Sequence, residues 1–215
     1  MKKIISYSLW GNKPTYTVGA LRNAELAKEI YPDWTCRFYV GKSVSADIIN
    51  SLIQYDNTEV FVMNEQGDWT GMFWRFYPAS DSDVSVMISR DTDSRLDMRE
   101  KLAVDEWLVS GKSFHIMRDH PFHATEILGG MWGVRGTILA DMKTMITDYV
   151  KGDFWQVDQN FLKEKIYPMI RHDCCVHDEF FEKKSFPNIR QPQRFVGQAY
   201  NEKDEILHPE HAGLV

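Results

Sequence analysis

The sequence contains little cysteine, no long apolar run and no excess of positive charge. Three of its 215 residues are cysteines, and two of these, Cys174 and Cys175, are adjacent, which argues against a disulfide framework. No apolar run approaches the roughly 20 residues that a membrane helix needs, and the residues after Met1 turn polar too early for a signal peptide. We therefore expect a soluble, cytoplasmic protein with no membrane span.

The formal net charge is −6, and the lysines and arginines are scattered along the chain rather than clustered. Nucleic acid is therefore not an expected partner, because its recognition needs a concentrated positive field. With 43% hydrophobic residues, the chain can bury the core of one sizeable domain. We expect a single domain over residues 1–215, in which residues from about 202 to 215 form a polar tail or a linker.

The first third of the chain alternates between short β-branched runs and segments with helical periodicity. Strand, helix, strand, helix and strand in this order predict an α/β fold with parallel strands joined by right-handed crossovers. The predicted strands are Lys3–Leu9, Cys36–Val40 and Thr58–Met63, and the predicted helices are Thr17–Tyr31 and Ser45–Gln54.

The later elements follow from the same periodicities. We expect helices over Gly71–Tyr77, Asp97–Val109 and Ile138–Val150, and a further helix that Asp158 caps and that ends near Pro168; the expected strands are Phe114–Met117, Ile127–Gly136 and a last short one over Phe195–Gln198. The polar loop Arg118–His123, with a proline and two histidines, has the composition of a site rim.

A buried strand from Val84 to Ser89 runs into two aspartates, Asp91 and Asp93, separated by one residue. In extended backbone these side chains leave the same face, so their oxygens can converge on one point. That arrangement suits Mg²⁺ or Mn²⁺, which are bound through carboxylates, water and substrate phosphates. An alternative is that the two aspartates start the next helix, where they would accept hydrogen bonds from its free N–H groups.

Three other binding motifs fail on spacing. A calcium loop counted from Asp91 would place Leu96 where glycine is required and Leu102 where the bidentate glutamate belongs. The run His172–His177 alternates faces in extended chain, so its histidines and cysteines cannot readily form one zinc site. The glycines of Ile127–Gly136 lack the position and the acidic partner of a dinucleotide loop.

The sequence resembles the GT-A glycosyltransferases, whose mark is a DxD motif at the end of a sheet strand. Asp91-Thr92-Asp93 matches that motif. The run Gly71–Arg95 and the stretch Gly129-Gly130-Met131-Trp132-Gly133 are similar to a small viral and bacterial group of these enzymes, and the resemblance covers most of the chain. The resemblance implies one GT-A-type, Rossmann-like domain with a mixed, mostly parallel sheet between helices. If the protein is viral, the resemblance also implies that it is located in the host cytoplasm.

The resemblance also implies how the donor is held. Asp91 and Asp93, with Thr92 between them, would hold Mn²⁺ (or Mg²⁺) on the diphosphate of a nucleoside-diphosphate sugar. Arg75 would contact the nucleotide sugar. The end of the first strand, Leu9, Trp10, Gly11 and Asn12, would lie near the base and ribose, with Trp10 or Tyr16 stacked on uracil.

For the sugar end, the resemblance implies that Gly129 and Gly130 leave room for the sugar and the acceptor. Asp158 and Gln159 correspond to an Asp-Gln pair that retaining relatives place beside the sugar ring. A late histidine often supplies a third metal ligand in such enzymes; of His172, His177 and His208, His177 is our candidate.

The implied reaction is transfer of the sugar, from a uridine or guanosine diphosphate donor with UDP favoured, to a hydroxyl of a glycan or glycoprotein, with retention. No matched residue is a convincing catalytic base. An aspartate-nucleophile phosphatase is an alternative, although its motif normally ends the first strand of its domain. A sugar nucleotidyltransferase is a further possibility, but the Gly-rich loop with arginine and lysine that it carries after the first strand is missing from Trp10-Gly11-Asn12-Lys13-Pro14. A domain that binds carbohydrate without turning it over also remains open.

Overall fold

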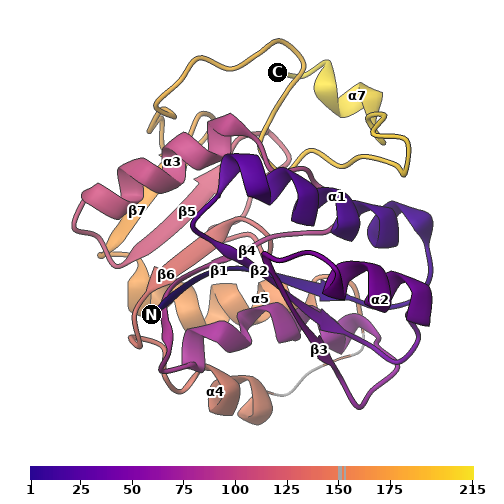
Figure 1. Cartoon of the computed structure of the whole chain (residues 1–215). Helices are drawn as coiled ribbons and strands as arrows, with labels where there is room; N and C mark the ends of the chain where they lie inside the picture. Colours follow the sequence, from indigo (N-terminus) through magenta and orange to yellow (C-terminus); the bar gives the residue numbers. More distant parts are fainter. Residues whose placement is uncertain (150–151, 153) are drawn as a thin grey trace.

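The computed structural model describes residues 1–149, 152 and 154–215 of the chain. In this part, one seven-stranded sheet has the order β3-β2-β1-β4-β6-β5-β7, with helices on both faces (Figure 1). The strands are β1 Lys2–Leu9, β2 Thr35–Val40, β3 Thr58–Val62, β4 Val84–Ser89, β5 Phe114–Arg118, β6 Trp132–Arg135 and β7 Cys174–Asp178. The helices of the first two thirds are α1 Pro14–Ile30, α2 Ala46–Ile53, the 3₁₀ helix η1 Trp69–Ser80, α3 Met98–Val109 and α4 Met142–Asp148.

The mixed, mostly parallel sheet is confirmed. β1 pairs in parallel with β2 and β4, β2 pairs in parallel with β3, and β5 pairs in parallel with β7. The one reversed strand of the sheet is β6, which runs antiparallel to both β4 and β5. The carboxyl ends of β1, β4, β5 and β7 therefore lie at the same edge of the sheet as the amino end of β6.

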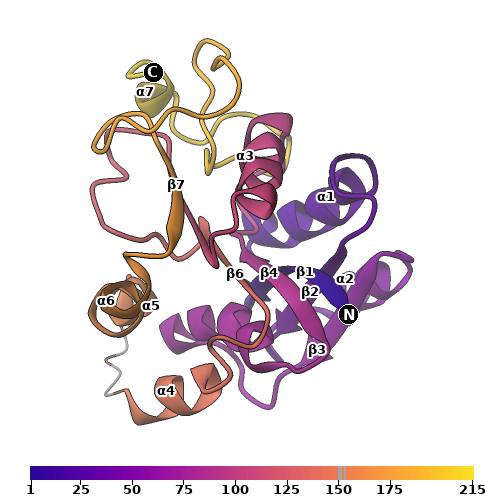
Figure 2. The same cartoon turned by 90° about the vertical axis from the view of Figure 1, so that its left-hand side faces the viewer.

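Two apolar cores fill the space between the sheet and its helices. Alternate residues of β4 divide between them: Met87 packs on one face, beneath η1, and Ile88 packs on the other, beneath α1 and α3. Figure 2 shows α1, α2 and α3 on one side of the sheet and α4, α5 and α6 on the other. Phe73 and Phe76 of η1 belong to the first core, where both are fully buried.

Several predicted boundaries are wrong. α1 begins at Pro14 rather than Thr17, because proline fits the first helical turn, whose N–H groups have no partner within the helix. The 3₁₀ helix η1 continues through Pro78 to Ser80 instead of ending before the proline. Ile127–Gly136 is a strand only from Trp132 onward. α4 is shorter than the predicted Ile138–Val150, and Val150 itself lies outside the described residues.

Two further expectations are corrected by local geometry. Asp158 does not cap a helix: α5, Val157–Phe161, begins one residue earlier, after Gln156, so Asp158 lies within its first turn. The chain stays helical through the π-helical turn η2, Leu162–Ile166, and α6, Tyr167–Ile170, and therefore passes Pro168. Phe195–Gln198 is a turn and not a strand, because Gly197 adopts a positive φ of 83°.

The segment after β7 contains little regular structure and is held to the domain by buried charge. The carboxylate of Asp119, fully buried after β5, accepts two hydrogen bonds from Arg99 of α3, at 2.8 and 2.9 Å, and one from Arg190 at 2.5 Å. It also accepts the backbone N–H of Val196 at 3.0 Å. The segment crosses above α3 and α1 to the short helix α7, Pro209–Ala212 (Figure 1).

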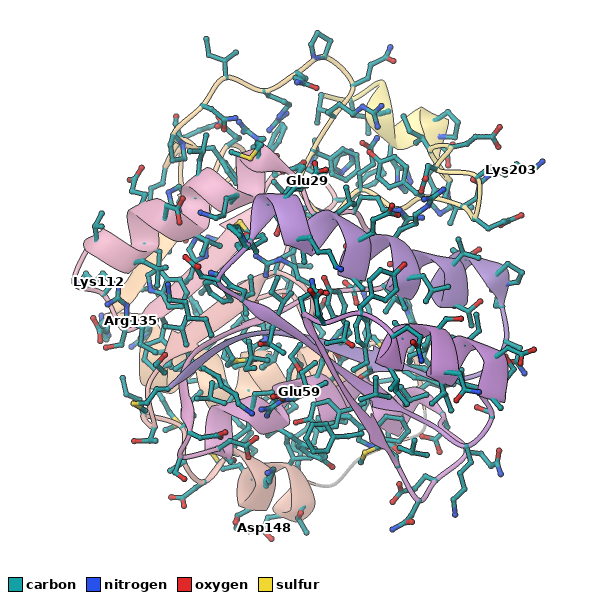
Figure 3. All side chains as sticks on the ribbon, viewed as in Figure 1. Glu29, Glu59, Lys112, Arg135, Asp148 and Lys203 are labelled. Carbon is teal, nitrogen blue, oxygen red and sulfur yellow. The ribbon has the colours of Figure 1, made fainter. Side chains whose placement is uncertain are left out.

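Charged side chains on the outside of the molecule point into solvent, as Asp148 at the end of α4 and Lys203 in the C-terminal segment do at opposite ends of Figure 3. None of the helices in the described part of the chain is both long and apolar enough to span a membrane.

Replacing Asp119 should loosen the C-terminal segment. The Asp119→Ala variant leaves the guanidinium groups of Arg99 and Arg190 without their buried partner, so we expect its free energy of unfolding to fall by about 3 kcal/mol or more. Denaturant titration measures this loss. The matched control is Glu179→Ala, which removes a more exposed partner of Arg99 and should cost clearly less; equal losses in the two variants would contradict the role given to Asp119.

Candidate active site

A cavity of about 410 Å³ opens at the carboxyl edge of β1 and β4. Most of the predicted site residues line it, although they come from segments far apart in the chain. They are Leu9, Trp10, Tyr16, Arg75, Asp91, Thr92, Asp93, Gly129, Gly130, Asp158 and Gln159. The structure thus brings the DxD motif, the predicted arginine and the Asp-Gln pair to one place.

The loop that carries Asp91 and Asp93 is fixed from two sides. Asn23 of α1 donates its side-chain amide to the carbonyl of Ser94 at 2.9 Å, and the backbone N–H of Tyr200 donates to the carbonyl of Asp93 at 2.8 Å. The aspartates do not start the next helix, because α3 begins at Met98 and is capped by Asp97. That alternative is therefore wrong.

The two carboxylates differ in their surroundings. The side chain of Asp91 is 41% exposed in the cavity. Burial, and then the negative charge of Asp91, raises the pKa of Asp93 to about 6. Two like charges that face one cavity repel each other, and a bound cation would remove that repulsion. The pair therefore fits a hard divalent ion.

Arg75 joins the DxD loop to α5. Its guanidinium is almost fully buried and pairs both with Asp91 and with Asp158, whose Oδ2 lies 2.7 Å from Nη2. Its backbone N–H donates to Ser8 Oγ at 3.0 Å, which fixes η1 against β1. Burial raises the pKa of Asp158, and the charge of Arg75 opposes that shift.

Gly129 and Gly130 are required by this charge cluster. A Cβ at Gly129 would lie 2.4 Å from Nη2 of Arg75 and 2.6 Å from Oδ2 of Asp158, and a Cβ at Gly130 would lie 2.0 Å from Oδ2 of Asp91. The sequence predicted that these glycines leave room for sugar and acceptor. Although both glycines also line the cavity, the space beside their Cα atoms is taken by the protein's own charged side chains.

Tryptophans form one end of the cavity. Trp10, at the end of β1, makes edge contacts with Trp69 and with Trp74, each at 6.4 Å between ring centroids. Gly67, with a positive φ of 98°, approaches Trp10 so closely that a Cβ there would lie 2.2 Å from the Cβ of Trp10. Trp10 is therefore held in a fixed position beside Tyr16.

The structure does not bring Gly11, Asn12 or His177 to the cavity lining. Gly11 donates its N–H to Ser43 Oγ at 2.7 Å, and Asn12 binds the backbone at the start of α2. His177 of β7 lies 2.9 Å from the ring nitrogen of His115 and packs on Phe186. Since its ring is enclosed there, we do not place His177 among the metal ligands. His172, another of the late histidines, is exposed beside Arg171.

The cavity also has walls that the sequence analysis did not assign. His123 lines it, and its loop had been predicted as a site rim. Trp155 and Gln156 are separated from the Asp158-Gln159 pair only by Val157 and could have been found by that proximity. Gly197 and Ala199 come from the irregular C-terminal segment. No local pattern distinguishes them, because a contact made by an aperiodic segment leaves no mark in the sequence.

The fold is that of the GT-A nucleotide-diphospho-sugar transferases, as the resemblance implied. No family model matches the chain, and no curated protein matches it in sequence. The structure is similar to that of a glycosyltransferase involved in the glycosylation of the major capsid of PBCV-1, with 15% identity, a TM-score of 0.58 and full coverage of both chains. It is also similar to the galactosyltransferase LgtC in complex with donor and acceptor sugar analogs, with 13% identity, a TM-score of 0.51 and coverage of 83% of this chain and 74% of that one.

The buried pair His115–His177 predicts a dependence of stability on pH. Burial lowers the pKa of both imidazoles below their usual 6.5, so below that pH the unfolded chain binds more protons than the folded one. The stabilisation is fully present above pH 6.5 and is lost as the pH falls. From pH 7.5 to 5.5 the wild type should lose about 1 kcal/mol more unfolding free energy than His115→Phe. Denaturant titrations at the two pH values test this; parallel losses would contradict it.

Adding one methyl group at Gly130 should disturb the candidate metal site at Asp91 and Asp93. In Gly130→Ala the new Cβ pushes against the carboxylate of Asp91, so Mn²⁺ binding, measured by isothermal titration calorimetry, should weaken at least about 10-fold. Gly213→Ala is the control, since a Cβ there meets nothing closer than 3.7 Å. Unchanged Mn²⁺ affinity in Gly130→Ala would contradict the placement of Asp91 in the site.

Proposed function

We propose that the protein is a metal-dependent glycosyltransferase that moves a sugar from a nucleoside-diphosphate sugar, with UDP as the favoured nucleotide, to a hydroxyl of a glycan or glycoprotein. One observation carries the proposal: paired carboxylates at the end of β4 share a cavity with the aromatic residues Trp10 and Tyr16 and with Asp158 and Gln159. A nucleotide sugar combines a base, a diphosphate and a sugar ring, and the cavity offers a suitable group to each of these parts.

The charges of the site support a divalent cation. Asp91, Asp93 and Asp158 bring three carboxylates and Arg75 one guanidinium, so these four groups sum to −2 when ionised. A diphosphate adds further negative charge and needs a counterion there. Asp91 and Asp93 are the residues that would hold Mn²⁺ or Mg²⁺, which as a Lewis acid stabilises the charge of the departing diphosphate.

The chain's own residues have separate tasks in this proposal. Trp10 and Tyr16 offer ring faces to the base, and Arg75 holds Asp91 and Asp158 in fixed orientations. Asp158 and Gln159 lie where the sugar ring would sit. In a reaction with retention, an oxygen of the leaving diphosphate takes the proton of the acceptor hydroxyl, so that no separate base is needed.

The two other classes account for less of the site. A domain that only binds carbohydrate does not need a metal clamp for a diphosphate. An aspartate-nucleophile phosphatase needs a free nucleophile, whereas one oxygen of Asp91 is engaged by Arg75. Glycosyl transfer gives a role to the carboxylate pair, to the aromatic residues and to Asp158 and Gln159.

Binding of the donor should be detectable by its effect on stability. A UDP-sugar at about 100 times its Kd should add roughly 2.7 kcal/mol to the unfolding free energy, and we expect this gain in a thermal-shift panel only when Mn²⁺ or Mg²⁺ is present. Asp91→Ala should abolish the gain, because the diphosphate loses its metal.

The control for this experiment is Asp83→Ala. Asp81 and Asp83 have the same spacing as the DxD pair but precede β4, and the side chain of Asp83 is exposed. The control should keep the full metal-dependent shift. A wild type that no nucleotide sugar stabilises, or an Asp91→Ala variant that is stabilised as well as the wild type, would refute the proposed function.

A further inference from the structure

A second hollow, of about 200 Å³, lies next to the donor cavity. The two share His123, Gly197 and Ala199 as lining residues. A molecule in the hollow would therefore touch the same three residues as a ligand in the cavity. Neither acidic side chains nor lysine and arginine are among the described residues that line the hollow, so its chemistry suits an uncharged ligand.

Aromatic rings form the wall of this hollow. Phe122 is 63% exposed, and its ring stands perpendicular to that of His211 with 4.9 Å between centroids. Phe195 packs against His120 at 4.4 Å. Rings of this kind, open to solvent on one face, pack against the apolar C–H faces of sugar rings, while sugar hydroxyls stay free to bind polar groups.

The wall is held in place by specific hydrogen bonds. His120 Nε2 donates to the carbonyl of His211 at 3.0 Å, and His120 Nδ1 accepts the backbone N–H of Phe122 at 3.0 Å. This one imidazole thus joins the loop after β5 to α7. Phe122 and His211 keep their relative position because both are bound to it.

His123 presents a hydrogen-bond donor at the boundary between the two spaces. Its Nδ1 accepts the backbone N–H of Asp119 at 3.0 Å, and burial lowers the pKa of the ring to about 3. The neutral ring must therefore carry its proton on Nε2. Within the described part of the chain this Nε2 has no hydrogen-bond partner, so it is available to an oxygen of a ligand.

We propose that this hollow binds the acceptor, as one neutral sugar ring stacked on Phe122 beside the imidazole of His211, with His123 Nε2 donating to one of its oxygens. The inference rests on the proposed function and names the place of its second substrate. The acceptor hydroxyl oxygen bonds to the anomeric carbon of the donor. The bond from that carbon to the diphosphate oxygen breaks, its electron pair leaves with the diphosphate, and the hydroxyl proton passes to a diphosphate oxygen.

Direct sugar binding can be measured without any donor. In saturation-transfer NMR with the methyl glycosides of glucose, galactose and mannose, the wild type should transfer magnetisation to at least one of them. Phe122→Ala, at an exposed position, should lose at least about nine tenths of the signal. Phe181→Ala is the matched control, because Phe181 is also exposed but lies outside the hollow; it should behave as the wild type.

His123 is tested through the reaction. With the bound glycoside as acceptor, His123→Leu should raise the acceptor KM at least about 10-fold and by clearly more than it raises the donor KM, whereas His123→Gln, which keeps a side-chain N–H, should recover most of the loss. Absence of glycoside binding to the wild type, or equal binding to Phe122→Ala, would overturn the inference. A protein that binds glycosides through Phe122 but no nucleotide sugar would instead refute the proposed function.

Discussion

One buried guanidinium organises the candidate site. Arg75 of η1 lies between Asp91, which follows β4, and Asp158 of α5, and it neutralises part of the charge of both. Without this cation, Asp158 would be a buried carboxylate with no charged partner, which costs several kcal/mol. The close approach of Gly129 and Gly130 follows from the same cluster, because any side chain there would displace one of its members. The sheet, the 3₁₀ helix η1 and the helical segment that begins with α5 are thus positioned relative to one another by charge as well as by packing.

Much of the fold was predictable because it is encoded locally. The strands before Thr58 and the helices between them could be predicted from hydrophobic periodicity. Asp91 and Asp93 could be predicted as site residues because they come after a buried apolar strand. The direction of β6 was not encoded in this way, since the apolar pattern of a strand is the same for either direction. The reversal is seen in the register, because the partners of β6 fall in number from Arg135 to Trp132 along β4 and from Val134 to Trp132 along β5.

The features that sequence reasoning misplaced or missed depend on contacts between residues far apart in the chain. His177 is a histidine late in the chain, as a metal ligand in this family often is, yet its neighbours in space are His115 and Phe186. The role of Asp119 depends on Arg99 and Arg190, which lie 20 and 71 residues away. Such pairs are set by the tertiary structure, and no local pattern of charge identifies them.

The contacts of Ala199 and Tyr200 with the loop of Asp91 and Asp93 also bear on how the protein folds during its synthesis. Ala199 forms a β-bridge with Ser94, and Tyr200 binds the carbonyl of Asp93, whereas the last strand of the sheet ends at Asp178. Since nascent domains begin to fold from their amino-terminal side, a growing chain can assemble the sheet while the DxD loop still lacks this support. The loop of Asp91 and Asp93 thus gains its full support only after the residues near position 200 have left the exit tunnel.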